Sequence, residues 1–200
     1  IYEDYYSNSV TLKGLERNTA YVYRVSGIDE EGNTIWSDVY NYHTQNAAEG
    51  FGFLVAGDPQ IGSGKVDSDT EGWVNTMTMA VNKFSDVSFL LSVGDQVNSA
   101  SGNSLANEYQ GFLADGAMLS SIPFAPSVGN HDSNTITSYV THNTLPNMSS
   151  YGSSSDEVTG DEDYSFRYGN TIFMMLNTNN SSIAEHKAFI EETIANNQDA

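Results

Sequence analysis

Three apolar segments of the sequence each end in a glycine that is followed at once by a residue able to bind a cation. These residues are Asp58, Asp95 and the pair Asn130 and His131. In an open α/β sheet, sites form at the carboxyl ends of the strands, so we expect these side chains to meet on one rim. Neighbouring carboxylates repel one another unless a proton or a cation neutralises them. Oxygen and imidazole ligands suit Zn, Mn, Fe or Mg, and two such ions about 3.5–4 Å apart are the usual arrangement for hydrolysing a phosphoester.

Alternating strands and helices must position these residues. Apolar runs predict the strands, and apolar residues at helical spacing predict the helices. In chain order we expect strand 51–56, helix 73–84, strand 87–93, helix 105–113, strand 124–128, strands 164–168 and 171–176 as an antiparallel pair, and a last helix. That helix begins at Ser182 with a capping-box pattern. The polar segment 133–163, rich in Gly and Ser, is expected to be a long surface loop or an insertion.

Residues 1–46 have a different sequence pattern, which predicts short strands separated by turns. Alternating residues predict a strand at 21–25, and a further strand is expected at about 37–44. The small and polar residues 45–50 fit a linker. We therefore predict one unit over 1–46 and a second over 50–200.

Three ordered blocks carry a resemblance to a known family. They are Gly57-Asp58-Pro-Gln, Gly94-Asp95-Gln-Val-Asn98 and Gly129-Asn-His-Asp132. In this order they resemble the calcineurin-like metallophosphoesterases, and the preceding strands narrow the resemblance to the purple-acid-phosphatase-like branch. That branch carries a fibronectin type III-like domain before the catalytic one, and Tyr21 stands where such domains place a tyrosine that bonds back to the backbone.

The resemblance implies an α/β fold of the metallophosphatase type, a β-sandwich flanked by helices (α/β/β/α), preceded by part of an all-β fibronectin III-like sandwich. Residues 1–46 would be the C-terminal part of the fibronectin-like domain. Residues 50–200 would be the N-terminal part of the metallophosphoesterase domain.

The resemblance also implies two divalent metal ions, Zn, Mn or Fe, and a role for each motif residue. Asp58 would bind the first metal, Asp95 would bridge both, and Asn130 would bind the second through its amide oxygen. A hydroxide held between the metals would attack phosphorus. His131 would protonate the leaving alkoxide, and Asp132 would orient its imidazole.

Two positions depart from the family pattern. Many members have His two residues after the first Asp, where this chain has Gln60. Purple acid phosphatases have Tyr three residues after the bridging Asp, where this chain has Asn98. Because that tyrosine gives the purple colour, we expect a colourless protein. Asn98 is counted as a candidate metal ligand, and whether Asn98 or Gln60 supplies a weak oxygen ligand stays open.

The family takes further histidines from two later blocks, Val-x-x-His and Gly-His-x-His. This chain has four histidines, and none lies in such a block. We therefore expect a fragment cut at both ends, which by itself binds metals poorly and has little or no activity.

The balance of charged residues disfavours some classes of binding partner. Lys and Arg total 7 against 26 Asp and Glu, which gives a net charge of −19. Such a surface repels nucleic acids and anionic membranes, and no apolar run approaches the roughly 20 residues of a membrane span. The absence of cysteine excludes disulfides and thiol catalysis. We expect a small phosphoester as substrate, no nucleic acid and no membrane insertion. Low Lys with abundant Asn, Ser and Thr suggests an exported bacterial protein, extracellular or at the cell surface, although no signal peptide is visible.

Three functions fit these patterns. Hydrolysis of phosphomonoesters is the leading interpretation. A phosphodiesterase or nucleotidase of the same fold is the first alternative. The second is a non-catalytic cell-surface module with a degenerate metal site, which Gln60 and Asn98 support.

Overall fold

Three parallel strands form the centre of the fold. The computed structural model describes residues 7–99, 102–114, 116, 118–133, 136–151 and 163–200. The strands β5 (Gly52–Ala56), β6 (Val87–Ser92) and β7 (Phe124–Ala125) lie side by side in the order β5-β6-β7. Parallel neighbours need crossover connections, which α1 (Val66–Lys83) and α2 (Gly102–Phe112) provide. The strand predicted over 124–128 is shorter than expected, because Pro126 has no N–H to donate to the ladder.

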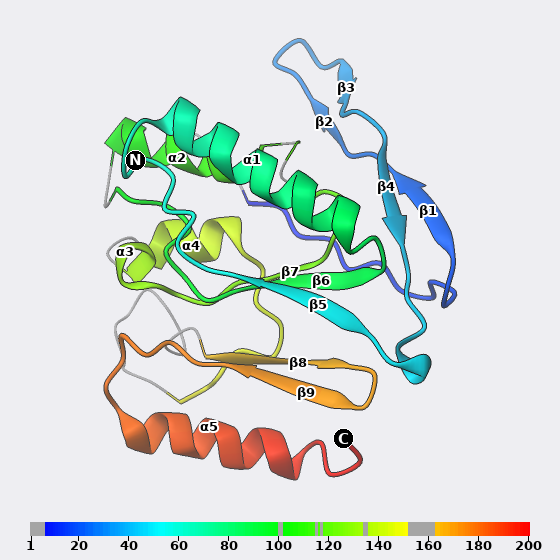
Figure 1. Ribbon diagram of the computed structural model, residues 1–200, viewed down its shortest axis with the longest axis vertical. Helices are drawn as coiled ribbons and strands as arrows, with labels where there is room; N and C mark the ends of the chain where they lie inside the picture. The colour runs from blue at the N-terminus through cyan, green and yellow to red at the C-terminus, as the bar shows by residue number, and fades with distance from the viewer. Residues whose placement is uncertain (1–6, 100–101, 115, 117, 134–135, 152–162) are drawn as a thin grey trace.

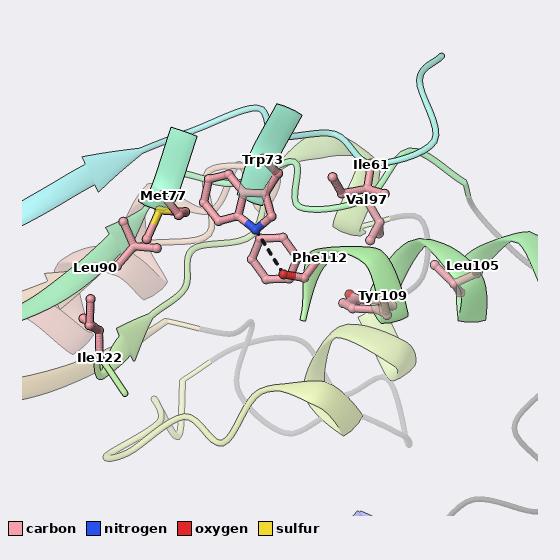
Figure 2. Packing of buried hydrophobic residues seen from close by; sticks show 9 residues of the cluster. All are labelled: Ile61, Trp73, Met77, Leu90, Val97, Leu105, Tyr109, Phe112 and Ile122. Carbon is pink, nitrogen blue, oxygen red and sulfur yellow. Dashed lines mark hydrogen bonds between the residues drawn. The ribbon is translucent and has the colours of Figure 1, made fainter. Parts of the chain in front are cut away.

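An apolar core fills the space between the two helices and the sheet. Leu90 of β6 is fully buried there and pairs with Leu54 of β5. Trp73 of α1 stacks on the ring of Phe112 of α2 at 5.5 Å, and its Nε1 donates to the Phe112 carbonyl at 3.0 Å (Figure 2). Because the indole N–H is satisfied inside the core, this contact fixes α1 against α2 without leaving a buried polar atom unpaired.

A hairpin covers the opposite face of the parallel sheet. It consists of β8 (Tyr164–Tyr168) and β9 (Thr171–Met175), which pair antiparallel as predicted, and α5 (Ile183–Ala195) lies beyond it. Phe89 of β6 stacks on Phe53 at 4.9 Å and meets Phe166 and Phe173 edge-on at 5.5 and 5.3 Å. The layers therefore run helices, parallel sheet, hairpin and helix (Figure 1), which is the predicted α/β/β/α order.

Phe89 is expected to contribute strongly to stability, because it is only 2% exposed and sits between the two sheets. Phe89→Ala should lower the free energy of unfolding by about 3–5 kcal/mol, the usual cost of removing a buried aromatic ring. Urea denaturation measures this change, with Phe84→Ala as the control because Phe84 is 48% exposed. Equal losses in the two variants would contradict the packing role of Phe89.

The first part of the chain forms two separate ribbons. One pairs β1 (Ala20–Tyr23) with β4 (Tyr40–His43), and the other pairs β2 (Ser26–Ile28) with β3 (Thr34–Trp36). The backbone N–H of Glu16 donates to the Tyr21 hydroxyl at 2.8 Å, which is the corner bond expected from the sequence. Within the described residues these ribbons do not build a fibronectin-type sandwich. A short 3₁₀ helix, Ala47–Glu49, lies in the predicted linker.

Two local predictions need correction. The segment 133–163 is not all loop, because α4 (Ile136–His142) follows closely on α3 (Asn130–Ser133); its residues 134–135 and 152–162 lie outside the described residues. The capping box at Ser182 does not form, since the Ser182 side chain makes no cap bond. The side chain of Asn180 replaces it, accepting the Ser182 N–H at 2.8 Å and donating to Glu185 at 2.9 Å.

No described helix combines the length and the apolar character that crossing a bilayer requires.

Candidate functional site

Hydrogen bonds join the three predicted motif loops at the carboxyl end of the parallel sheet. The Asp58 N–H donates to the Gly94 carbonyl at 3.1 Å, and the Gln60 N–H donates to the Asp95 carbonyl at 2.9 Å. The His131 N–H donates to Asp95 Oδ1 at 2.9 Å. Each bond crosses from one loop to another. The structure therefore brings the three motifs together on one rim, as their positions after the strands predicted.

The backbone is strained at three residues of the motif loops that are candidates for binding a cation. Asp58, Gln60 and Asp95 have φ values of +53°, +40° and +52°, in the left-handed region that non-glycine residues seldom adopt. Such conformations cost of order 1–3 kcal/mol each and persist where the surrounding structure enforces them, often at functional sites. Here the bonds between the loops provide that enforcement.

Close packing of two glycines brings the second and third loops into contact. A side-chain carbon at Gly94, where φ is +108°, would lie 2.5 Å from the backbone nitrogen of Gly129. A side-chain carbon at Gly129 would overlap the carboxylate and the backbone nitrogen of Asp95. Only glycine permits this approach, which places the Asp95 carboxylate against the turn that carries Asn130 and His131.

The rim presents oxygen donors that suit a divalent cation. Asp58 and Asn130 are exposed, Asn98 is half-buried, and Asp95 is 8% exposed. Carboxylate and amide oxygens are ligands for Mn, Mg and Zn. Within the described residues, however, no group of three or more His, Cys, Asp or Glu side chains is arranged to hold a metal ion. The donors fit a cation in their chemistry, and the described residues supply only part of a complete ligand set.

The imidazole of His131 is held from two sides. Its Nδ1 lies 2.8 Å from the Asn98 carbonyl oxygen, and its Nε2 lies 2.8 Å from Gln60 Nε2. A carbonyl oxygen can only accept, so Nδ1 carries the proton and Nε2 accepts from the Gln60 amide. The same amide nitrogen donates to Asn98 Oδ1 at 3.3 Å. The two residues that depart from the family pattern thus contact each other beside the imidazole.

Comparison with known proteins found similarity at the level of structure. The chain aligns over 92% of its length with the purple acid phosphatase PPD1 from seeds of yellow lupin (Lupinus luteus), with a TM-score of 0.68 and 20% sequence identity. The chain shares its fold with the matched part of that purple acid phosphatase. It spans 35% of the length of the lupin protein. No protein-family model and no curated protein matches the sequence.

The purple acid phosphatase fold agrees with the predicted resemblance to metallophosphoesterases and with the mixed α/β class. At 20% sequence identity, the similarity to the lupin protein supports a shared fold and no more specific property. A fibronectin type III domain and the extent of the natural protein are not shown by it.

Asp132 does not orient the imidazole, contrary to expectation. It is fully buried, and its carboxylate accepts the N–H groups of Gly129 and Gln96 at 2.9 and 3.1 Å. Both ring nitrogens of His131 face other residues, Nδ1 the Asn98 carbonyl and Nε2 the Gln60 amide. Burial raises the pKa of Asp132, and the backbone N–H bonds oppose that rise. Asp132 therefore holds the turn that carries His131.

Two further carboxylates support the rim. Asp69 of α1 accepts the N–H groups of Gly62 and Gly64 at 3.0 and 2.9 Å, in the loop after β5. Glu108 of α2 is 2% exposed and holds the loop after β6. Sequence reasoning did not identify either residue. The available signal was an acidic residue at 108 beside the apolar positions of a helix, where a buried charge needs partners.

Proposed function

We propose that the protein hydrolyses phosphoesters, most readily phosphomonoesters, with two divalent cations of Zn, Mn or Fe. The observation that carries this proposal is the convergence of Asp58, Asp95 and the Asn130–His131 turn on one rim of the parallel sheet. The structural comparison supports the proposal, because the lupin protein to which this chain is similar in fold is a purple acid phosphatase.

In this proposal Asp58, Asp95, Asn130 and Asn98 hold the cations. Bound cations would polarise the phosphoryl oxygens and lower the pKa of an attacking water. Histidines of the Val-x-x-His and Gly-His-x-His type would complete the ligand set in this proposal. The chain alone is accordingly expected to bind metal weakly and to show little activity.

His131 acts as the general acid for the leaving alkoxide. Its backbone N–H is bonded to Asp95 and its Nδ1 to Asn98, so the ring is fixed with Nε2 facing the Gln60 amide. Proton donation requires a hydrogen on Nε2, and the Gln60 amide must then turn its oxygen toward the ring, since an amide N–H cannot accept. Gln60 therefore adjusts to the protonation state of His131.

The general-acid role predicts a dependence on the leaving group. His131→Ala in the full-length protein should slow hydrolysis of an alkyl phosphate by about 10²–10⁴-fold. The loss should be much smaller with p-nitrophenyl phosphate, because p-nitrophenolate leaves without a proton. Steady-state kcat/KM with both substrates measures the difference. His43→Ala is the control, because His43 is exposed on β4. Equal losses with both substrates would contradict the role.

Comparing the hydrolysis of a phosphomonoester with that of a phosphodiester tests the substrate class. Release of p-nitrophenol from p-nitrophenyl phosphate and from its bis ester, with Mn or Zn, separates phosphomonoesterase from phosphodiesterase activity. Faster hydrolysis of the bis ester would favour a phosphodiesterase or nucleotidase of the same fold.

A non-catalytic surface module is the second candidate. It is favoured by the Gln60–Asn98 contact, which places two amides at positions where the family has His and Tyr. In that case the full-length protein would bind neither Mn nor Zn and would hydrolyse neither ester.

The charge supports a small substrate in an exported protein. A net charge of −19 disfavours nucleic-acid partners, and bound cations would make only the rim locally positive. We accordingly propose a small phosphoester as the partner and the extracellular space or cell surface as the location.

A further inference from the structure

Glu108 is a buried carboxylate whose oxygens are directed at the loop that follows Asp95. Its side chain is only 2% exposed. Its Oε2 accepts the N–H of Asn98 at 3.0 Å and the N–H of Ser99 at 2.6 Å, and its Oε1 accepts the Ser99 hydroxyl. An ionised carboxylate in this position makes charge-assisted hydrogen bonds, which are stronger than neutral ones.

The peptide group between Asn98 and Ser99 connects this carboxylate to the imidazole. The N–H of that peptide belongs to Ser99 and donates to Glu108. The C=O of the same peptide belongs to Asn98 and accepts from His131 Nδ1 at 2.8 Å. The carboxylate and the imidazole therefore lie at opposite ends of one peptide group. Hydrogen bonds in such a chain polarise and strengthen one another, so the negative charge makes the Asn98 oxygen a better acceptor.

We propose that Glu108 is the positioning residue of His131, acting through the Asn98–Ser99 peptide. It keeps the proton on Nδ1, so that Nε2 is the acceptor of the Gln60 amide N–H at the rim. The arrangement places a peptide between the carboxylate and the histidine, where hydrolases often have a direct contact. Asp132, the acid next to His131 in the sequence, is already engaged by Gly129 and Gln96. The catalytic consequence rests on the proposed role of His131 as general acid, whereas the position of the proton does not.

The proton position is measured by NMR of ¹⁵N-labelled histidine in the metal-free, full-length protein at a pH where imidazoles are neutral. The His131 signal is assigned from its absence in His131→Gln. We expect the Nδ1–H tautomer in the natural protein, although histidine in water favours Nε2–H. Glu108→Gln should shift the tautomer ratio toward Nε2–H by about fivefold, as a charge-assisted bond is replaced by a neutral one.

Asp69→Asn is the matched control for a merely structural role. Asp69 also accepts two backbone N–H bonds from a rim loop, at Gly62 and Gly64, but does not contact the Asn98–Ser99 peptide. It should lower stability without moving the tautomer ratio of His131. Ser99→Ala removes only the hydroxyl bond to Glu108 and should also leave the ratio unchanged.

Two results would overturn the proposal. One is a natural protein whose His131 is in the Nε2–H form, and the other is an unchanged ratio in folded Glu108→Gln. If that variant does not fold, Glu108→Asp replaces it and should give an intermediate ratio. If the full-length protein proves inactive, the proposed function fails while the tautomer result still decides the role of Glu108. If it is active, Glu108→Gln should lower kcat more than it raises KM, and more for alkyl than for p-nitrophenyl phosphate.

Discussion

Replacing Asp95 by asparagine is expected to abolish metal binding and hydrolysis while leaving the protein folded. The amide oxygen of asparagine can still accept the His131 N–H that Asp95 Oδ1 accepts at 2.9 Å. Asparagine also tolerates the left-handed backbone that Asp95 adopts at φ +52°. The substitution therefore removes the charge and keeps the shape. The loss in kcat/KM should exceed the roughly 10–100-fold that removal of an outer-shell partner costs.

Metal content after dialysis, ester hydrolysis and urea denaturation test this expectation together in the full-length protein. Asp86→Asn is the control, because it removes an equal charge from an exposed position just before β6. It should change none of the three measurements. An Asp95→Asn protein that keeps both metal and activity would show that Asp95 is not a ligand.

Replacing Gly129 by alanine should cost about 3 kcal/mol or more, at the upper end of what overpacking usually costs. The added carbon would overlap the carboxylate and the backbone nitrogen of Asp95. Neither group can move easily, because Asp95 is bonded to His131 and its loop is bonded to Gln60. We expect a lower urea midpoint with an unchanged slope, together with weaker metal binding.

Gly72→Ala is the matched control for this substitution. Gly72 lies in α1, and a carbon added there meets nothing within 4 Å. Alanine in an exposed helix interior is favoured over glycine by about 0.5–1 kcal/mol, so this variant should be slightly more stable. If Gly129→Ala matched the control in stability and in metal binding, the close approach of the two loops would be unnecessary for the site.

The strands and the location of the rim could be predicted because their signals are local. The apolar run ending at Gly94 predicts a buried strand, and the following Asp95 must then lie at its carboxyl end. The hairpin around Gly169 was predictable for the same reason, since two alternating segments flank a turn. These features depend on residues that are adjacent in the sequence.

The support of His131 could not be predicted, because it depends on contacts between distant segments. Asp132 is next to His131 in the sequence, yet its buried carboxylate is directed at Gln96 and Gly129. Glu108 reaches the imidazole only through a peptide of another loop. Periodicity reports which face of a helix is apolar, and it carries no information about which loop a single polar residue on that face will meet.

We expect the rim to move as one unit, because hydrogen bonds join its loops. The Asp58 N–H is bonded to Gly94, the Gln60 N–H to Asp95, and the His131 N–H to the Asp95 carboxylate. An amide exchanges its hydrogen with solvent only when its bond opens, and here opening one loop breaks bonds of the next. Slow fluctuations of the three loops are therefore cooperative and linked to the parallel sheet. A ligand that reaches the rim meets a surface already in place, and little ordering of the chain opposes its binding.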